Sequence, residues 1–371
     1  MFYALESGGV RTYLNAKSDW FATHTRIHHT VVAPASCKDL HRSAFAGIPS
    51  VAIPHVAGYR IPLLNSMATR TLRALQPDLI EAGDPYQLAW VAARVGKELD
   101  VPLVAFYHSD LQEVMHQRFG NMAQAAAVRY TRYLYRKFDL VLAPSAVMVQ
   151  RLHDMGIAQV RHQPLGVDTR LFSPARRDAG LRRSLNLPDN TRLLVYAGRF
   201  MREKKLPLLI DAVHRLGAPY HLLMIGNGQL PRASPYITHL PFQRVAGELA
   251  RLLASCDVLV HPGDQETFGL VVLEAMACGI PVLGVRAGGV GELVARDTGV
   301  LVAPNCVAAL CDGIRQIFAL GPVFLGRHAR DLMLRKYDWN LIMPQLIGHY
   351  GSLLATHQRA ELEASVSYAI D

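Results

Sequence analysis

The sequence predicts an α/β protein with two Rossmann-like domains, each built on a doubly wound parallel sheet, that face each other across a cleft. Three observations predict this fold. Short apolar runs alternate with longer amphipathic stretches, which is the pattern of parallel strands joined by helices. The 371 residues are enough for two such domains. A segment rich in proline, glycine and charge, residues 164–180, divides the chain near its middle.

The expected strands are nearly continuous apolar runs, as in strands that are covered on both faces. They lie at residues 101–107, 138–144, 192–198, 220–226, 257–263, 281–285 and 299–304. Amphipathic stretches such as residues 203–217 and 246–256 predict the helices between them. We expect domains at residues 1–168 and 169–344, and a C-terminal helix at about 345–365 that crosses back to the first domain.

Composition and charge limit the classes of function. The net charge of +9 favours anionic partners, or serves only solubility. The basic residues are dispersed and no nucleic-acid-binding motif is present, so we expect no nucleic-acid partner. Five cysteines without a Cys-x-x-Cys pair predict neither a disulfide framework nor a zinc site, and fit a reducing cytoplasm. No signal peptide or membrane-spanning run is evident, so we expect a cytoplasmic protein that meets a membrane only at its inner face.

Two carboxylates stand out in the segment "HPGDQETFGLVVLEAMACGIPVLG", residues 261–284. Glu266 precedes an expected helix that ends near Gly279, and Glu274 lies two turns inside it. The start of a helix leaves backbone N–H groups that bind phosphate or hydroxyl oxygens. One acid for a sugar and one for a ribose explains the pair. The alternative is that Glu266 caps the helix and Glu274 is a buried acid with a cation partner.

Two further stretches place polar residues after strands. In "VYAGRFMREKKL", Arg199 and Lys204 follow a strand, where a guanidinium and an ammonium suit a diphosphate. The alternative is a solvated basic loop. In "AFYHSD", His108 ends an apolar strand and is either directed into the cleft or a satisfied core histidine.

Two glycine-rich turns are weaker signals. "GGVGEL", residues 288–293, lacks the Gly-x-Gly-x-x-Gly order and is equally a turn into a helix with Glu292 in its first turn. Gly8 and Gly9 open the chain almost directly, because only Met1–Leu5 remain for a strand before them.

Together these stretches resemble the retaining glycosyltransferases of family four, which have the two-Rossmann fold called GT-B. The resemblance covers nearly the whole chain and is closest from Glu266 to Glu274. The matching stretches are "SGGVRTYL", "YHSD", "VLAPS", "PLGVDTRLFSP", "YAGRFMREKKL", "MIGNG", "DVLVHPGDQETFGLVVLEAMACGIPVLG" and "AGGVGELV". The short segment before Gly8 departs from the family, whose first strand precedes this turn in full.

The resemblance implies a role for each matched residue. Glu266 would bind the donor sugar's hydroxyls, and Glu274 the nucleotide ribose. Arg199 and Lys204 would neutralise the donor diphosphate and the charge that develops on the leaving group. His108 would contact the donor sugar near the reacting centre. Backbone N–H groups of Phe268, Gly269 and Leu270 would help Glu266 to bind the sugar. The Gly8–Gly9 turn would let the backbone approach the diphosphate and the acceptor.

The resemblance also implies the reaction. A hexose would move from GDP-mannose or a UDP-hexose to a glycan or glycolipid hydroxyl, with retention of configuration and attack from the face of the departing diphosphate. The basic residues would replace a metal, and no carboxylate cluster has metal-ligand spacing, so we expect no metal and no cofactor besides the nucleotide sugar. A non-catalytic sugar-nucleotide-binding protein and a sugar-nucleotide epimerase of similar shape are the alternatives.

The acceptor is expected at the N-terminal domain. The stretch "VRYTRYLYRKF", residues 128–138, combines arginine, lysine and aromatic residues and suits anionic lipid headgroups. The alternative is an ordinary helix with one packed and one solvated face. A lipid-linked acceptor and a peripheral membrane contact are therefore hypotheses.

Overall fold

The computed structural model describes residues 8–34, 44–52, 60–229 and 234–368. The chain divides into two compact units. Unit 1 combines Met1–Pro164 with Ile342–Asp371, and unit 2 is Leu165–Leu341. The boundaries predicted from the sequence, 168 and 344, lie a few residues further along the chain. Met1–Leu5, the short strand expected before the Gly8–Gly9 turn, lies outside the described residues.

Unit 2 is built on a six-stranded parallel sheet with the order β11-β10-β9-β12-β13-β14. Its strands are β9 (Arg192–Ala197), β10 (Tyr220–Ile225), β11 (Ile237–Leu240), β12 (Val258–His261), β13 (Val282–Val285) and β14 (Gly299–Val302). The strand order reverses between β9 and β12, which come from opposite halves of the unit. In doubly wound sheets such a switch point opens a crevice at the carboxyl ends of the strands.

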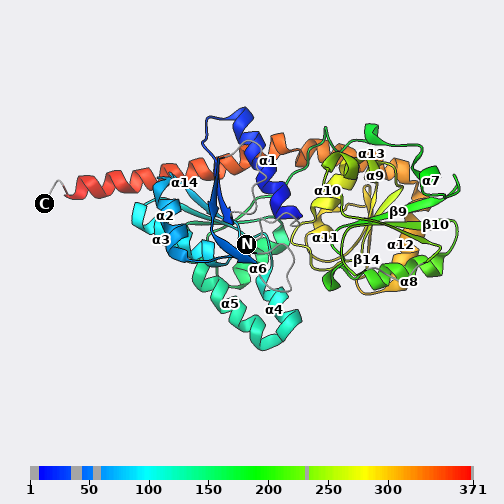
Figure 1. The fold of residues 1–371 in the computed structure, drawn as a ribbon, viewed down its shortest axis with the longest axis horizontal. Helices are drawn as coiled ribbons and strands as arrows, with labels where there is room; N and C mark the ends of the chain where they lie inside the picture. Colours follow the sequence, from blue (N-terminus) through cyan, green and yellow to red (C-terminus); the bar gives the residue numbers. More distant parts are fainter. Residues whose placement is uncertain (1–7, 35–43, 53–59, 230–233, 369–371) are drawn as a thin grey trace. The chain divides into compact units, whose positions relative to one another are not determined.

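Helices cover both faces of this sheet, with α8 and α12 on one face and α9 and α10 on the other (Figure 1). The helices are α7 (Leu181–Ser184), α8 (Leu206–Leu216), α9 (Ala246–Ala254), α10 (Leu270–Ala277), α11 (Val290–Leu293), α12 (Val307–Leu320) and α13 (Pro322–Leu332). Single turns are formed by η2 (Pro174–Arg176), η3 (Arg202–Lys204) and η4 (Met333–Tyr337). Because both faces are covered, β10, β12 and β13 are buried at every residue, which explains their apolar sequences.

Unit 1 contains a four-stranded parallel sheet, β5-β6-β7-β8, and two separate strand pairs, parallel β1-β2 and antiparallel β3-β4. The strands are β1 (Thr30–Pro34), β2 (Ala44–Ile48), β3 (Ser50–Ala52), β4 (Arg60–Pro62), β5 (Ile80–Ala82), β6 (Leu103–Phe106), β7 (Leu140–Ala143) and β8 (Val160–His162). The helices are α1 (Gly9–His24), α2 (Asn65–Ala74), α3 (Gln87–Leu99), α4 (Leu111–Phe119), α5 (Asn121–Tyr135), α6 (Ala146–Asp154) and α14 (Trp339–Tyr368).

The core of unit 1 lies where α2, α3, α5 and α6 pack on one side of the sheet. Ile80 and Ala82 of β5 face this core, whereas Glu81 between them points to the opposite face. Helices α1 and α14 lie on that opposite face and contact Glu81 (Figure 1). The predicted C-terminal helix is therefore α14, which begins a few residues earlier than expected and packs on unit 1 beyond Leu341.

All of the strands predicted from apolar runs are present, as β6, β7, β9, β10, β12, β13 and β14. The strands β1 to β5, β8 and β11 were not predicted. Of these, β3, β4, β5 and β8 are only three residues long, too short for an apolar run or an alternation to distinguish them from loops. Strand β5, for example, is the tripeptide Ile-Glu-Ala.

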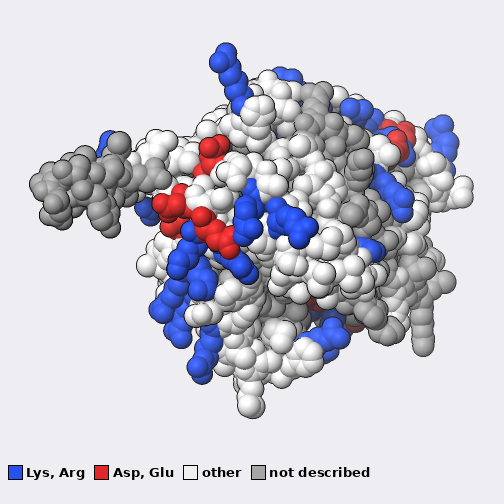
Figure 2. Space-filling model, turned by 60° about the vertical axis from the view of Figure 1, so that its left-hand side comes forward, with Lys and Arg blue, Asp and Glu red and all other residues white. Residues whose placement is uncertain are grey.

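Figure 2 shows one face, on which Lys and Arg side chains gather beside a smaller group of acids, in keeping with the net charge of +9. Among the described residues, no single helix has the length and apolarity to cross a membrane. One pair of consecutive helices has this length and apolarity when the two are taken together, but the pair is bent by 91°: Val307–Leu320 and Pro322–Tyr337.

Candidate functional site

The predicted donor-binding residues of unit 2 follow two adjacent strands at the switch point of its sheet. Arg199 and Lys204 lie in the connection that follows β9, and Glu266 lies in the connection that follows β12. Strands β9 and β12 are hydrogen-bonded neighbours, with Leu194 opposite Val258. Parallel neighbours end at the same edge of a sheet, so the fold brings these two connections together.

Lys204 and Glu266 meet directly at this edge. The Lys204 ammonium forms an ion pair with Oε1 of Glu266. The imidazole of His261, the last residue of β12, lies with its Nε2 at 3.2 Å from the same oxygen. Lys204 is thus not part of a fully solvated basic loop, and Glu266 is held from two sides.

The two oxygens of Glu266 differ in their surroundings. Both contacts are made to Oε1, and within the described chain no hydrogen bond or ion pair is made to Oε2. Burial alone would raise the pKa of the Glu266 carboxyl, but the Lys204 ammonium and the His261 ring lower this pKa below its ordinary range. Glu266 is therefore ionised at neutral pH and offers one oxygen to a hydroxyl donor.

The glycine turn after β13 supports the backbone of Glu266. Gly289 N–H donates a hydrogen bond of 2.8 Å to the Glu266 carbonyl. A Cβ at Gly288 would lie 2.7 Å from that carbonyl oxygen, and Gly288 has a φ of +57°. Only glycine fits this close approach without displacing the backbone. The turn then continues into α11 with Glu292 in its first turn, as the alternative interpretation of this stretch predicted.

Helix α10 begins where the sequence predicts, at Leu270, after Gly269 as its N-terminal cap in the left-handed conformation. No side chain caps this helix, and its first turn holds no acid. The interpretation of Glu266 as a helix cap is therefore wrong. The backbone N–H groups at Phe268, Gly269 and Leu270 lie at or next to this helix start, where an oxygen ligand is favoured.

Glu274 lies in the middle of α10 and is half-buried. The described residues provide no hydrogen bond or ion pair to its carboxylate, so the alternative of a buried acid with a cation partner is also wrong. Burial raises the pKa of Glu274 to about 7. A carboxyl without a protein partner at this depth is available to the vicinal hydroxyls of a bound ribose.

Arg199 is placed on the exposed side of the connection after β9. Its backbone carbonyl accepts a hydrogen bond of 2.9 Å from the hydroxyl of Tyr196, a buried residue of β9. This bond fixes the backbone from which the guanidinium extends. Arg199 and Lys204 thus come from one short connection at the edge that also carries Glu266.

In unit 1, His108 lies just beyond β6, at the carboxyl edge of the sheet. Its ring stacks on Phe106 at 4.1 Å with an interplanar angle of 3°, and it lies 5.0 Å from the ring of Tyr13. Burial lowers the pKa of His108 to about 4, so the imidazole is neutral at physiological pH. Tyr13 belongs to the first turns of α1, which begins at Gly9, so His108 and the Gly8–Gly9 turn share this edge of unit 1.

The space next to Gly8 is open. A Cβ built on Gly8 meets no atom within 4 Å, and its φ of −69° is one that any residue adopts. The structure therefore leaves room for a ligand at this turn but does not itself require glycine there.

Comparison with known proteins decides the family. A profile described as "Glycosyltransferase Family 4" matches residues 7–171, and one described as "Glycosyl transferases group 1" matches residues 191–319. A "GDP-mannose-dependent alpha-mannosyltransferase" from Mycobacterium tuberculosis is 32% identical over 82% of this chain and 80% of its own length. The chain belongs to the family 4 glycosyltransferases.

Other relatives agree with this assignment. A "GDP-mannose-dependent alpha-(1-6)-phosphatidylinositol dimannoside mannosyltransferase" from Mycobacterium tuberculosis is 29% identical over 95% of this chain and 94% of its own. The structure of sucrose-phosphate synthase from Thermosynechococcus elongatus superposes with a TM-score of 0.78 at 25% identity, and covers 94% of both chains. This glycosyltransferase has the GT-B fold and acts as a nucleotide-sugar glycosyltransferase.

One residue of the glycosyltransferase site was missed by sequence reasoning. His261 is 2% exposed and contacts Glu266, and in the described structure its Nδ1 is buried without a hydrogen-bond partner. The signal was present, because a histidine that ends an apolar strand directs its side chain toward the carboxyl edge. The same reasoning was applied to His108 but not to His261.

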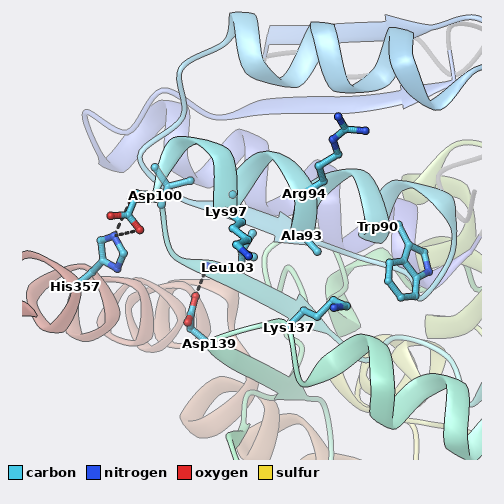
Figure 3. A pocket seen from close by; sticks show the side chains of 11 residues that line it. Trp90, Ala93, Arg94, Lys97, Asp100, Leu103, Lys137, Asp139 and His357 are labelled. Carbon is cyan, nitrogen blue, oxygen red and sulfur yellow. Dashed lines mark hydrogen bonds and ion pairs between the residues drawn. The ribbon is translucent and has the colours of Figure 1, made fainter. Parts of the chain in front are cut away.

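The glycosyltransferase also has a cavity of about 450 Å³ in unit 1, within the usual size range of ligand pockets (Figure 3). It lies at the amino ends of β6 and β7, beside Leu103 and Asp139, on the edge opposite His108. Asp139 accepts a hydrogen bond of 2.8 Å from the Leu103 N–H, and Asp100 pairs with His357 (Figure 3). None of the predicted site residues lines this cavity, and its acids are already engaged, so we do not assign the donor site to it.

Within residues 8–34, 44–52, 60–229 and 234–368, no group of three or more His, Cys, Asp or Glu side chains is arranged to hold a metal ion. The connection after β9 carries the cations Arg199, Arg202, Lys204 and Lys205, of which Arg199 and Lys204 are the ones predicted to meet the diphosphate.

Proposed function

We propose that this glycosyltransferase moves a mannosyl group from GDP-mannose to a hydroxyl of a glycan or lipid-linked acceptor, with retention of the anomeric configuration. Relatives at 32% and 29% identity carry names that specify GDP-mannose, which favours it over a UDP-hexose as donor. In the reaction, the bond from the sugar C1 to the diphosphate oxygen breaks. A bond from C1 to the acceptor oxygen forms on the same face, and GDP leaves.

The observation that carries this proposal is that two side chains, Lys204 and His261, contact the Glu266 carboxylate. Oε1 is occupied by Lys204 and His261, while Oε2 has no partner within the described chain. A fixed carboxylate with one open oxygen is suited to accept a hydrogen bond from a sugar hydroxyl. The adjacent start of α10 adds backbone donors for the remaining oxygens.

Lys204 and Arg199 provide the positive charge for the diphosphate. As the bond to C1 breaks, negative charge grows on the leaving diphosphate, and cations held nearby stabilise that charge most where water is excluded. In the structure Lys204 forms an ion pair with Glu266. The diphosphate therefore competes with Glu266 for the ammonium when the donor binds.

A ligand panel tests the donor. Thermal unfolding is measured with GDP-mannose, UDP-glucose, UDP-galactose and the free nucleotides GDP and UDP. A ligand at 100 times its Kd stabilises the folded state by about 2.7 kcal/mol, and we expect the largest shift with GDP-mannose. A larger shift with a UDP-sugar would overturn the choice of donor, and no shift with any of them would overturn the proposal.

Product analysis tests the reaction. Donor turnover is followed by release of GDP, and the anomeric configuration of the product by NMR. Formation of an epimerised sugar nucleotide without acceptor would indicate an epimerase, and tight binding without turnover a binding protein. Inversion at C1 would contradict the retaining mechanism.

No metal or other cofactor enters the proposed reaction, because Arg199 and Lys204 supply the charge. Turnover is compared before and after exhaustive chelation with EDTA. We expect the same rate, and loss of activity that Mg²⁺ or Mn²⁺ restores would contradict a metal-independent mechanism.

We also propose a cytoplasmic location with contact to the inner face of an anionic membrane. The helices α4 and α5 form a hairpin in unit 1 (Figure 1), with large apolar side chains exposed near its tip. Phe119 is 62% and Met122 is 89% exposed. Helix α5 contains no Asp or Glu, and Arg129, Arg136 and Lys137 are exposed on or just after it. Arg118 is exposed beside the Phe119 ring at the tip, whereas Arg136 and Lys137 lie at the opposite end of α5. An apolar tip with a cation beside it is suited to an anionic lipid surface.

The packed face of residues 128–138 consists of Thr131, Leu134 and Tyr135, so this stretch also has the packed and solvated faces of an ordinary helix. Flotation with phosphatidylglycerol and with phosphatidylcholine vesicles distinguishes the two interpretations. We expect binding to the anionic vesicles only, and loss of that binding in Phe119→Ser/Met122→Ser. The control is Val323→Ser/Phe324→Ser, which changes an equally exposed apolar pair of unit 2. Equal binding of both vesicle types, or of neither, would contradict the proposal.

A further inference from the structure

A charged cluster is buried within unit 1, where three elements meet. Lys17 of α1 is 3% exposed, and Tyr350 of α14 is 8% exposed. Both contact Glu81 of β5, whose side chain is 9% exposed. Lys17 Nζ lies 3.0 Å from Glu81 Oε1 and donates a hydrogen bond of 2.8 Å to the Tyr350 hydroxyl. The Tyr350 hydroxyl in turn donates to Oε2 of Glu81, so the three groups form a closed ring.

Stability alone does not account for this cluster. Burying an ion pair removes both charges from water, and apolar side chains of similar volume are often as stabilising or more so. A fully hydrogen-bonded network instead fixes one geometry, because each group has only one arrangement that leaves none unsatisfied. The cluster is therefore expected to hold its three elements in a defined position.

The cluster lies next to Tyr13 and His108, at the carboxyl edge of the unit 1 sheet. Tyr13, one turn before Lys17 on α1, donates a hydrogen bond of 3.4 Å to Glu81. The Tyr13 ring lies 5.0 Å from the rings of both Phe106 and His108. Strands β5 and β6 are paired, with Glu81 opposite Val104, so Glu81 and His108 come from neighbouring strands. A single aromatic ring thus separates the buried charges from His108.

The buried charges also change the pKa of His108. The charged and titratable groups that act on it are Lys17 of α1, Glu81 of β5 and Asp84 just after β5, while Tyr13 contacts its ring. Burial lowers the pKa of His108, Glu81 raises it and Lys17 lowers it. The two buried charges therefore act on the imidazole in opposite directions.

We propose that Lys17, Glu81 and Tyr350 are positioning residues, which fix α1 and, through Tyr13, the ring of His108 at the site edge of unit 1. Through the Tyr350 hydroxyl, the C-terminal helix α14 takes part in building this edge. The inference rests on the proposed function and on the contact between His108 and the donor sugar that the family resemblance implies.

NMR titration of His108 tests the link without relying on activity. The His108 signal is assigned by its loss in His108→Asn. Lys17→Met removes a cation and is expected to raise the pKa of His108, and Glu81→Gln removes an anion and is expected to lower it. The double variant Lys17→Met/Glu81→Gln leaves no buried charge unpaired, so it tests the link through ring position even if a single variant does not fold. We expect a changed His108 chemical shift in it. An unchanged His108 signal and pKa across these variants would overturn the proposal.

Kinetics test the positioning. Tyr350→Phe removes one hydroxyl and keeps the ring, and we expect kcat to fall about tenfold with an unchanged KM for the donor, because a small displacement near the reacting centre slows the chemical step. Tyr220→Phe is the matched control, since it removes a hydroxyl that accepts a hydrogen bond of 2.7 Å from Arg192 at the amino end of β10. Equal losses in both variants, or none in Tyr350→Phe, would overturn the proposal. If the unaltered protein binds no sugar nucleotide, the proposed function fails, and the titration still decides the role of the cluster.

Discussion

Lys204 and Glu266 form an ion pair across the switch point of the unit 2 sheet, although they are 62 residues apart in the chain. Lys204 follows β9 and Glu266 follows β12, and these two strands are neighbours. The pair places the cation proposed for the diphosphate and the acid proposed for the sugar at one point. Each group of the pair neutralises the charge of the other.

Lys204→Ala is expected to lower kcat at least about a hundredfold, because it removes a cation that stabilises the leaving diphosphate. The fold should persist, since His261 still contacts Glu266. Steady-state kinetics and circular dichroism measure the two effects. Arg202→Ala is the control, because it removes an exposed cation of the same connection. A rate for Lys204→Ala close to that of Arg202→Ala would contradict the role of Lys204.

His261→Phe is expected to lower kcat about tenfold or more, because it keeps a ring of similar shape but removes one of the two contacts that orient Glu266. His221→Phe is the control. His221 is also a buried histidine of unit 2 with one side-chain hydrogen bond, 2.8 Å to Thr238, but it lies on β10 near its amino end. Full activity in His261→Phe would show that Lys204 alone positions Glu266.

Glu274 is expected to make stability depend on pH. Its pKa is about 7 in the folded protein and about 4.3 when unfolded. Below about pH 4 both states hold the proton, so the group has no effect. As the pH rises from about 4 to about 7, the unfolded state releases the proton while the folded state keeps it, so folding becomes less favourable, and above pH 7 there is no further change. The upper limit of this loss is about 4 kcal/mol, and solvent screening of this half-buried group reduces it. Glu274→Gln should therefore gain stability over the unaltered protein at pH 8 but not at pH 4, as measured by urea unfolding. The same gain at both pH values would be inconsistent with a raised pKa.

The same carboxylate should be needed for the donor. Glu274→Ala is expected to abolish most transfer while the fold stays intact, because the ribose hydroxyls lose their acceptor. Donor affinity of the unaltered protein should weaken as the pH falls below 7, since protonation removes the stronger acceptor. Isothermal titration with the donor at pH 6 and pH 8 measures this, and an affinity that rises toward low pH would argue against ribose binding by Glu274.

Gly288→Ala is expected to destabilise unit 2 by about 1–3 kcal/mol, from its positive φ and the close approach to the Glu266 carbonyl. It should also reduce turnover, because the backbone that carries Glu266 has to move. Gly291→Ala, in the helix α11 that follows this turn, is the control, since a Cβ there meets no atom closer than 3.8 Å. Equal melting temperatures for the two variants would contradict the constraint at Gly288.

The sequence suffices to name candidate site residues, because polar residues at the ends of apolar strands are visible without a structure. Glu266, Lys204, Arg199 and His108 were all found in this way. The direct contact between Lys204 and Glu266 was not predicted, nor was the role of His261. Both depend on which strands are neighbours, and the order β9-β12 is not encoded in any local pattern.

The sequence by itself determined where the strands with continuous apolar runs and the helices with a clear amphipathic pattern lie, because a strand covered on both faces needs the first and a helix on a sheet needs the second. Only the tertiary structure decided which strands are neighbours and which strand ends therefore lie side by side. Strand pairing joins distant segments through backbone hydrogen bonds that any side chain allows, so it leaves little trace in local sequence. For the same reason the tripeptide strand β5, and with it the burial of Glu81 between Lys17 and Tyr350, became apparent only in the folded chain.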